Sequence, residues 1–271
     1  MDESKRNLFK VAGIQMVSTP QPAQNYATAQ RLVREAAQQG AKLALLPEYW
    51  PVMGLKDTDK LALAERDGGE IQAQMAAMAK DNAVWLIGGT LPLATADAGK
   101  VLNTTLVYNP QGEVAARYDK IHLFSFTRGE EHFDEARTIR HGAEVKTFDA
   151  PFGKVGLSIC YDLRFPELYR AMGDCALMVV PSAFTYTTGQ AHWELLLRAR
   201  AIENQCYVLA AAQGGAHPNG RRTWGHSMLI DPWGEILSVL PSGEGLVIGD
   251  IDPHRLQYVR EILPALQHRK L

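Results

Sequence analysis

Short apolar runs with the alternation of β-strands recur along the chain, and longer segments with helical periodicity separate them. Strand-forming runs are rich in β-branched and aromatic residues, whereas an amphipathic helix repeats its apolar residues every three or four positions. The pattern predicts strands over 8–17, 41–48, 83–90, 176–181 and 206–212, a further strand that ends at Cys160, and helices over 28–39, 69–80 and 192–204 and from about 166. This alternation favours stacked layers of sheet and helix over an all-α or all-β fold.

Two further segments, 101–118 and 226–240, each predict a pair of alternating strands joined by a tight turn. Their turns are similar, because the first contains N-P-Q-G-E and the second contains D-P-W-G-E. The similarity of these two turns indicates two similarly built halves, and no linker or low-complexity segment divides them. We therefore expect one α/β domain over residues 1–271.

The composition is ordinary for a globular protein with a large core, since 46% of the 271 residues are hydrophobic and 21% are charged. The net charge is -2 and the pI is near 6.5, and the Lys and Arg residues are scattered along the chain. Without a basic stripe, we expect neither a nucleic acid nor an anionic membrane as partner. The expected partner is a small molecule.

The chain begins without an apolar secretory segment, and its longest apolar runs are far shorter than a membrane span. Its three cysteines, Cys160, Cys175 and Cys206, are an odd number and form no C-x-x-C pair. Free thiols are therefore expected rather than a disulfide framework or a zinc knuckle. Together these features predict a cytoplasmic protein.

Three polar residues stand at the ends of predicted strands, where a buried polar group is costly unless it is paired or used. They are Glu48 after L-A-L-L-P, Lys120 before I-H-L-F, and Cys160 after V-G-L-S-I. Taken singly, each has a simple structural explanation: a packed thiol, a turn cap or a solvated charge. Taken together, they supply a nucleophile, a base and a cation.

A thiol with an ordinary pKa of ~8.5 needs a base or a cation to act as a nucleophile at neutral pH. Glu48 can take the proton of Cys160, and Lys120 can stabilise the thiolate and then the oxyanion that forms on a carbonyl. Because the chain should turn into a helix after Cys160, the backbone N–H of Tyr161 can also point at that oxyanion.

The sequence around these residues resembles the nitrilase-like carbon–nitrogen hydrolases, whose Glu-Lys-Cys triad occurs in this chain order. The likeness covers most of the chain between Phe9 and Asp252. It is carried by the motifs L-L-P-E, Y-D-K-I-H-L-F, I-C-Y-D-L-R-F-P-E-L, P-S-A-F-T-Y-T-T-G-Q-A-H-W-E, R-A-R-A-I-E-N-Q-C-Y-V and G-H-S-M-L-I-D-P-W-G-E.

This resemblance implies a four-layer α-β-β-α sandwich as one domain, with a core at about 8–252. It also implies a homodimer or higher homo-oligomer, with the C-terminal tail 253–271 packed on a partner subunit, and no metal or cofactor. A second active-site glutamate is expected in F-D-E-A-R-T-I at Glu135, and Glu130 and Glu131 are its neighbouring alternatives.

The branch that the sequence most resembles is the Nit1-type deaminated glutathione amidases, through A-I-E-N-Q-C-Y-V-L-A-A-A-Q-G-G-A-H and G-H-S-M. The resemblance implies hydrolysis of a non-peptide amide through a thioester, with the substrate carboxylate held near Arg164, Phe184 and Thr188. The alternatives are a Nit2-type ω-amidase acting on 2-oxoglutaramate and another nitrilase-type amidase, such as one for N-carbamoyl amino acids.

Three rival interpretations remain open. A serine hydrolase would use Ser158 in G-L-S-I-C, which departs from G-x-S-x-G at its last glycine; on an extended strand Ser158 would share the face of Cys160. A metal hydrolase is disfavoured because the eight histidines form neither H-x-x-x-H nor H-E-x-x-H, although His122 and His192 lie in family motifs. A catalytically silent binding or scaffold protein is the non-enzyme alternative.

Overall fold

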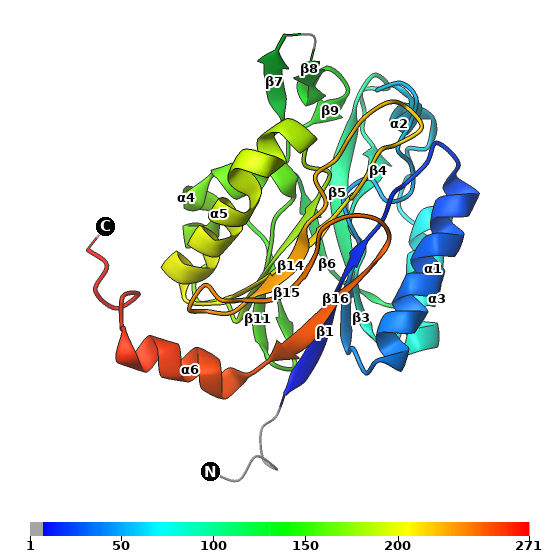
Figure 1. The fold of residues 1–271 in the computed structure, drawn as a ribbon. Helices are drawn as coiled ribbons and strands as arrows, with labels where there is room; N and C mark the ends of the chain where they lie inside the picture. Colours follow the sequence, from blue (N-terminus) through cyan, green and yellow to red (C-terminus); the bar gives the residue numbers. More distant parts are fainter. Residues whose placement is uncertain (1–7, 130, 271) are drawn as a thin grey trace.

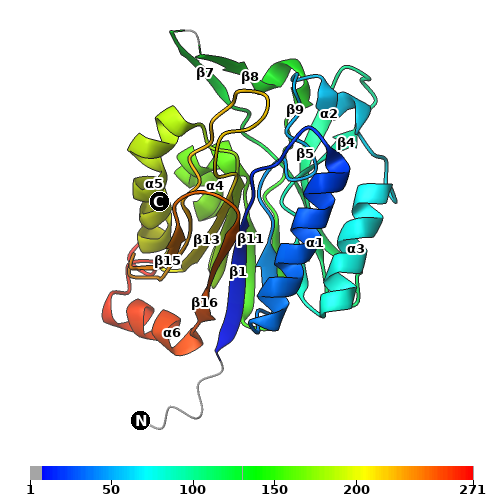
Figure 2. The ribbon, with the colours of Figure 1, turned by 45° about the vertical axis from the view of Figure 1, so that its right-hand side comes forward.

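Two β-sheets pack face to face at the centre of the molecule, and helices cover their outer faces (Figure 1). The computed structural model describes residues 8–129 and 131–270. Helices α1 (Pro22–Gln38) and α3 (Glu70–Asn82) lie on one side, and α4 (Pro166–Ala171) and α5 (Tyr186–Asn204) lie on the other (Figure 2). The expected α-β-β-α sandwich is confirmed.

The first sheet has eight strands, of which β6 (Val114–Asp119) and β9 (Ile139–Arg140) both pair with β5. The order of the other six is β16 (Gly245–Ile251), β1 (Phe9–Gln15), β2 (Leu43–Leu45), β3 (Trp85–Ile87), β5 (Val101–Tyr108), β4 (Leu91–Ala94).

The second sheet has six strands. Their order is β10 (Thr147–Ala150), β11 (Gly153–Leu157), β12 (Leu177–Ser182), β13 (Tyr207–Ala212), β14 (Ser227–Ile230), β15 (Ile236–Leu240). The strands β7 (Ser125–Arg128) and β8 (Glu131–Asp134) form a separate hairpin at one end of the sandwich, and the short helix α2 (Asp59–Ala62) lies at the same end (Figure 1).

The core between the sheets is built from side chains that alternate along each strand. One registered row of buried residues crosses each sheet: Leu45, Ile87 and Val107 in the first, and Leu157, Val179 and Leu209 in the second. The outward faces pack on the helices, where α1 buries Leu32 and Val33 and α5 buries Trp193 and Leu197.

The two sheets come into close contact at Gly13 of β1. A Cβ at this position would lie 3.2 Å from the carbonyl oxygen of Ala210 and 2.9 Å from a methyl carbon of Val247. Beyond Gly13, the Met16 N–H donates to Ala212 O at 3.3 Å, and the Gly214 N–H donates to Met16 O at 2.8 Å. These bonds join the two sheets at the end where their loops converge.

Both predicted hairpins are present, and their turns have the same construction. In the first, Asn109 N–H donates to Glu113 O and the glycine of the turn, Gly112, has φ 81°. In the second, Asp231 N–H donates to Glu235 O, and Gly234 has φ 90°. Glycine suits both turns because a left-handed backbone is strained for other residues.

Several boundaries differ from the sequence prediction. Helix α1 begins at Pro22 rather than at position 28, and α5 begins at Tyr186 rather than at position 192. Their first turns are polar or carry small residues, so they lack the apolar repeat on which the prediction depended. Strand β2 ends at Leu45 and β11 at Leu157, so neither strand reaches Glu48 or Cys160.

Strand β16 and helix α6 (Pro253–Ile262) lie in a region for which no element was predicted. Helix α6 buries Leu256 and Val259, and Arg260 on the same helix donates to the carbonyl oxygens of Gln205 and Cys175. This part of 253–271 therefore packs on its own subunit, and its packing on a partner subunit stays a prediction. None of the described helices is long and apolar enough to cross a bilayer.

Candidate active site

Glu48 and Lys120 lie in the loops just beyond β2 and β6, and Cys160 begins a short 3-10 helix just beyond β11, at the same end of the sandwich. The Lys120 Nζ donates to Glu48 Oε1 at 2.9 Å, although 72 residues separate the two along the chain. Glu48 and Cys160 line the same small cavity. The sequence-predicted triad is thus brought together.

Glu48 is held in place by four hydrogen bonds and is 1% exposed. Its Oε1 accepts from Asn103 Nδ2 at 2.9 Å as well as from Lys120, and its Oε2 accepts from the Ala183 N–H at 2.8 Å. Its carbonyl oxygen accepts from Gln213 Nε2 at 3.0 Å. These donors fix the backbone and the carboxylate of Glu48 in place.

Glu135 forms the other half of the lysine site. Lys120 Nζ lies 3.0 and 2.8 Å from its two carboxylate oxygens, Tyr49 OH donates to Oε1 at 2.7 Å, and the Phe124 N–H donates to Oε2 at 2.8 Å. Of the alternatives, Glu131 is exposed on the β7–β8 hairpin and accepts from Thr187 Oγ1, and Glu130 lies outside the described residues.

The Lys120 ammonium and the Glu135 carboxylate shift each other's pKa. Burial by itself would lower the pKa of the Lys120 ammonium, but the carboxylates of Glu135 and Glu48 outweigh burial and raise that pKa above its ordinary value. Burial would likewise raise the pKa of Glu135, but the Lys120 charge and its hydrogen bonds lower it. Lys120 and Glu135 are therefore charged at neutral pH.

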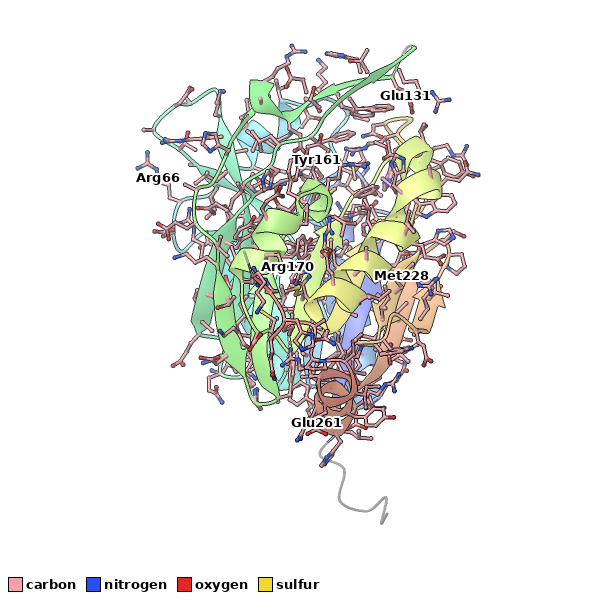
Figure 3. All side chains as sticks on the ribbon, turned by 90° about the vertical axis from the view of Figure 1, so that its left-hand side faces the viewer. Arg66, Glu131, Tyr161, Arg170, Met228 and Glu261 are labelled. Carbon is pink, nitrogen blue, oxygen red and sulfur yellow. The ribbon has the colours of Figure 1, made fainter. Side chains whose placement is uncertain are left out.

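Cys160 begins a short 3-10 helix, η3 (Cys160–Arg164), and its φ is 48°. A positive φ is uncommon for a residue with a side chain, and here it turns the thiol out of the line of β11. Tyr161 follows in the first turn of η3, where backbone N–H groups have no partner within the helix. Figure 3 shows Tyr161 below the β7–β8 hairpin, which carries Glu131.

The turn at Cys160 is anchored by Asp162, whose side chain is 0% exposed. Its Oδ2 accepts from Tyr118 OH at 2.7 Å and from the Ile159 N–H at 2.8 Å. Its Oδ1 accepts from the His122 N–H at 3.0 Å and lies 2.7 Å from His122 Nδ1. Asp162 thus links the turn that carries the Cys160 thiol to the segment that follows Lys120.

Burial and the nearby Glu48 carboxylate raise the pKa of the Cys160 thiol well above its ordinary value, and the Lys120 ammonium opposes this only in part. The thiol is therefore protonated at neutral pH. Proton transfer to a base must accompany attack, which is the task predicted for Glu48.

Ser158 does not line the thiol cavity and is packed in the core, the role that its place two residues before Cys160 suggested beside the serine-hydrolase alternative. Its Oγ lies 2.8 Å from Tyr169 OH and donates to Val179 O at 2.8 Å, and the residue is 1% exposed. The alternation that predicted a common face ends with β11 at Leu157. Ser158 is a packed core residue, which removes the basis for a serine hydrolase.

The thiol opens into a cavity of about 260 Å³. Its lining includes the predicted residues Tyr161, Phe184 and Thr188. Arg164 is not among the lining residues: its guanidinium lies 5.7 Å from the Tyr161 ring centroid and 5.3 Å from that of Phe184, and its Nη1 lies 3.2 Å from His192 Nδ1. Arg164 therefore lies beside the wall that these two rings form.

Comparison with known proteins agrees with this geometry. The family model for carbon-nitrogen hydrolase matches residues 10–261. The chain belongs to the carbon–nitrogen hydrolases. It is a nitrilase-superfamily enzyme, a hydrolase of carbon–nitrogen bonds other than peptide bonds.

Relatives of this hydrolase cover nearly its whole length. It is 42% identical over 267 residues to deaminated glutathione amidase of Synechocystis sp., covering 96% of this chain and 98% of that protein. It is 40% identical over 266 residues to omega-amidase NIT2 of Homo sapiens, covering 97% and 95%. The C. elegans NitFhit structure matches with a TM-score of 0.87 and 36% identity, covering 97% of this chain and 65% of that longer chain.

Two charged residues near the thiol of this hydrolase were given no role from the sequence. Asp162 stands two positions after the cysteine, directly beyond the apolar strand that leads to it, and this position was the available signal for a buried carboxylate. Arg221 lines the thiol cavity from the loop between β13 and β14, in G-R-R-T, where no sequence feature marks it. Across residues 8–129 and 131–270, no three His, Cys, Asp or Glu side chains are arranged to hold a metal ion.

Proposed function

We propose that this hydrolase cleaves the amide of a small carboxylate-bearing substrate through a thioester on Cys160, and that deaminated glutathione is this substrate. The observation that carries the chemistry is the contact of Lys120 with both Glu48 and Glu135 beside the buried thiol. The substrate is supported by the likeness to deaminated glutathione amidase.

In the proposed first step, Glu48 takes the proton of the Cys160 thiol while sulfur bonds to the amide carbon. The carbonyl oxygen becomes an oxyanion, which is stabilised by the Lys120 charge and the Tyr161 N–H. When the intermediate collapses, the carbon–nitrogen bond breaks, the nitrogen takes the proton from Glu48, and the acyl group remains on sulfur as a thioester.

In the proposed second step, water attacks the thioester carbon and gives a proton to Glu48. The carbon–sulfur bond then breaks, the sulfur recovers that proton, and the product leaves as a carboxylic acid. Glu135 keeps Lys120 in position throughout, since it contacts the ammonium with both oxygens. Phe184 and Thr188 hold the acyl part, and Arg164 beside them attracts a carboxylate on that part.

The test is turnover by Cys160→Ala, with Cys175→Ala as the matched control because that thiol is also buried but lies away from the cavity. We expect Cys160→Ala to lose at least ~10³-fold in kcat with an unchanged unfolding midpoint, because the nucleophile is gone. Cys175→Ala should retain its kcat. Appreciable turnover by Cys160→Ala would refute the thioester.

The second candidate is an ω-amidase acting on 2-oxoglutaramate. It is supported by the likeness to omega-amidase NIT2 and by the close packing around the thiol, since Cys160, Phe184 and Thr188 are all buried and a small leaving group needs little room. The two candidates are separated by kcat/KM for deaminated glutathione and 2-oxoglutaramate, measured side by side on the same preparation.

We also propose that the enzyme is a cytoplasmic homodimer. The compartment is supported by its three free cysteines, since reduced thiols persist there. The dimer is supported by large apolar side chains that are exposed on neighbouring elements: Leu195 and Ile202 on α5, Trp233 in the β14–β15 turn, and Leu237 and Val239 on β15. A second copy of the chain would cover them.

A further inference from the structure

A second, larger hollow adjoins the thiol cavity. It is a cleft of about 840 Å³ between the loop after Glu48, helix α2, the end of the β7–β8 hairpin and the loop at 219–221. The cleft and the thiol cavity share three lining residues, Phe124, Glu135 and Arg221. A molecule that reaches Cys160 from the cleft must therefore pass Arg221.

The position of this cleft suits the amine part of the substrate. The Phe184 and Thr188 side of the thiol cavity is closed by residues that are 4% and 6% exposed. The amine must leave before water can attack the thioester, so its side of the amide has to face an opening. Among the described residues, the adjoining cleft provides that opening.

Arg221 has unused hydrogen-bonding capacity at the boundary between the two hollows. Its Nη2 donates to Ala183 O at 3.0 Å and its Nη1 lies 4.0 Å from Met53 Sδ, but its buried Nε has no partner. No carboxylate of the described residues lies within 4.0 Å of its guanidinium. By contrast, the buried Arg200 donates to Leu163 O and pairs with Glu203 at 2.7 Å.

A second cation, Lys60 on α2, lines the same cleft. Its Nζ donates to Thr138 Oγ1 at 3.1 Å and has no carboxylate partner within ion-pair distance in the described part of the chain. Burial lowers the pKa of Lys60, and the charges of Asp57 and Glu135 oppose this in part. An anion bound in the cleft would therefore stabilise its charged form.

The carboxylates that line the cleft are engaged elsewhere or exposed. Glu135 pairs with Lys120, the Asp134 side chain accepts from the Ala136 N–H, and Asp57 lies exposed at the rim. Among the described residues, no free carboxylate therefore balances the positive charge of Arg221 between the cleft and the thiol cavity, and an anionic ligand could do so. A guanidinium with a free buried N–H is well suited to a carboxylate.

We infer that Arg221, assisted by Lys60, binds a carboxylate carried by the amine part of the substrate, on the leaving-group side of the scissile amide. The inference rests on the proposed function and narrows it to amides whose amine is an amino acid or a short peptide with a free carboxyl terminus. Primary amides, which release ammonia, gain nothing from this pair of cations.

The test compares two substrates with the same 2-oxoglutaryl acyl group: deaminated glutathione, whose amine part ends in a carboxylate, and 2-oxoglutaramate, whose amine part is ammonia. We expect Arg221→Met to lower the ratio of their kcat/KM values about 10- to 100-fold, because one charge-assisted contact is lost from only the first substrate. Lys60→Met should lower the ratio in the same direction by a smaller factor.

The matched control is Arg222→Met, since Arg222 is exposed, stacks on Tyr186 and lines neither the cleft nor the thiol cavity. The ratio of its kcat/KM values for the two substrates should equal that of the wild type. An unchanged ratio in Arg221→Met would overturn the inference, as would an equal loss on both substrates, which would place the Arg221 contact on the acyl part. Failure of the wild type to hydrolyse either substrate would instead refute the proposed function.

A second measurement needs no variant. Deaminated glutathione with its terminal carboxylate capped as a primary amide keeps the size of the substrate and removes the charge. The wild type should hydrolyse the free acid with a kcat/KM at least about tenfold higher. Equal values for the two would overturn the inference even if Arg221→Met fails to fold.

Discussion

Lys120 is the residue on which the charge of the site depends. It is 0% exposed, and its only charged neighbours within 4.0 Å among the described residues are Glu48 and Glu135. Two carboxylates so close together repel each other unless a cation lies between them. The same ammonium therefore holds the site together and supplies charge for the proposed chemistry.

Replacing this residue should affect both stability and turnover. We expect Lys120→Met to lose nearly all activity and about 3–5 kcal/mol of unfolding free energy at pH 7, because two buried carboxylates are left without their cation. Exposed Lys80 on α3 gives the matched control, and Lys80→Met should change stability by less than about 0.5 kcal/mol. Urea titrations and steady-state assays measure the two effects.

The stability deficit of Lys120→Met should also depend on pH. Lys120 lowers the pKa of Glu135 in the folded protein, so in the wild type this pair stabilises the fold above the ordinary glutamate pKa of about 4.3, and the contribution is lost as pH falls through the folded-state value. The deficit should therefore shrink in acid. A deficit that stays constant as the pH falls from 7 to below the lowered folded-state pKa of Glu135 would show that the pair is not its cause.

The element that positions the proposed nucleophile, Cys160, is the 3-10 helix η3, and its geometry depends on Asp162. The chain leaves β11 at Leu157 and must turn before α4 begins at Pro166. Four polar contacts to one buried carboxylate determine where this turn lies. We assign Asp162 as a positioning residue, because it acts on the thiol through the backbone.

Asp162→Asn keeps the shape of the side chain but turns an amide donor toward groups that are themselves donors. We expect a loss of about 1–3 kcal/mol in stability and a fall in kcat of about 10- to 100-fold with little change in KM, because the thiol moves relative to Glu48. The control is Asp231→Asn: that carboxylate is also buried and accepts from Trp233 and Glu235 N–H groups far from the site. It should lose stability but keep its kcat, and an equal fall in kcat would show that general destabilisation explains both.

At the scale of the whole molecule, two sheets that fold from separate stretches of chain meet at the site. Gln213, which follows β13 of the second sheet, donates to the carbonyl oxygen of Glu48, which follows β2 of the first sheet. Ala183, which follows β12, donates to the carboxylate of the same residue. The proposed base is therefore held from both sheets, so the site exists only when the sandwich is closed.

The outer surface of the sandwich gives a test of the proposed dimer. Leu195 on α5 is 72% exposed, and Arg198, one turn further along the helix, donates to Gly234 O in the β14–β15 turn. We expect Leu195→Glu to shift the protein from dimer to monomer in analytical ultracentrifugation, because a charge would be buried at the interface. Val114→Glu is the control, since Val114 is 57% exposed on β6 of the other sheet. A wild type that sediments as a monomer would refute the dimer.

The sequence predicted best what depends on local periodicity. The strands around Leu45, Val179 and Leu209 were predicted because apolar residues recur with a spacing that any buried strand requires. The ends of the elements were less accurate: β11 stops before Cys160, and α5 begins before position 192. Ends are determined by turns and capping contacts, which tertiary neighbours supply.

The sequence by itself determined which chemical groups are available: the carboxylate of Glu48, the ammonium of Lys120 and the thiol of Cys160. It also carried the family resemblance that pointed to Glu135. Only the tertiary structure decided that Lys120 bridges two carboxylates, that Cys160 adopts a positive φ, and that Arg221 stands at the entrance with a free N–H. The physical reason is that charge and hydrogen bonding act through space over a few ångströms, and residues 72 positions apart along the chain come within that range only when the sheets close.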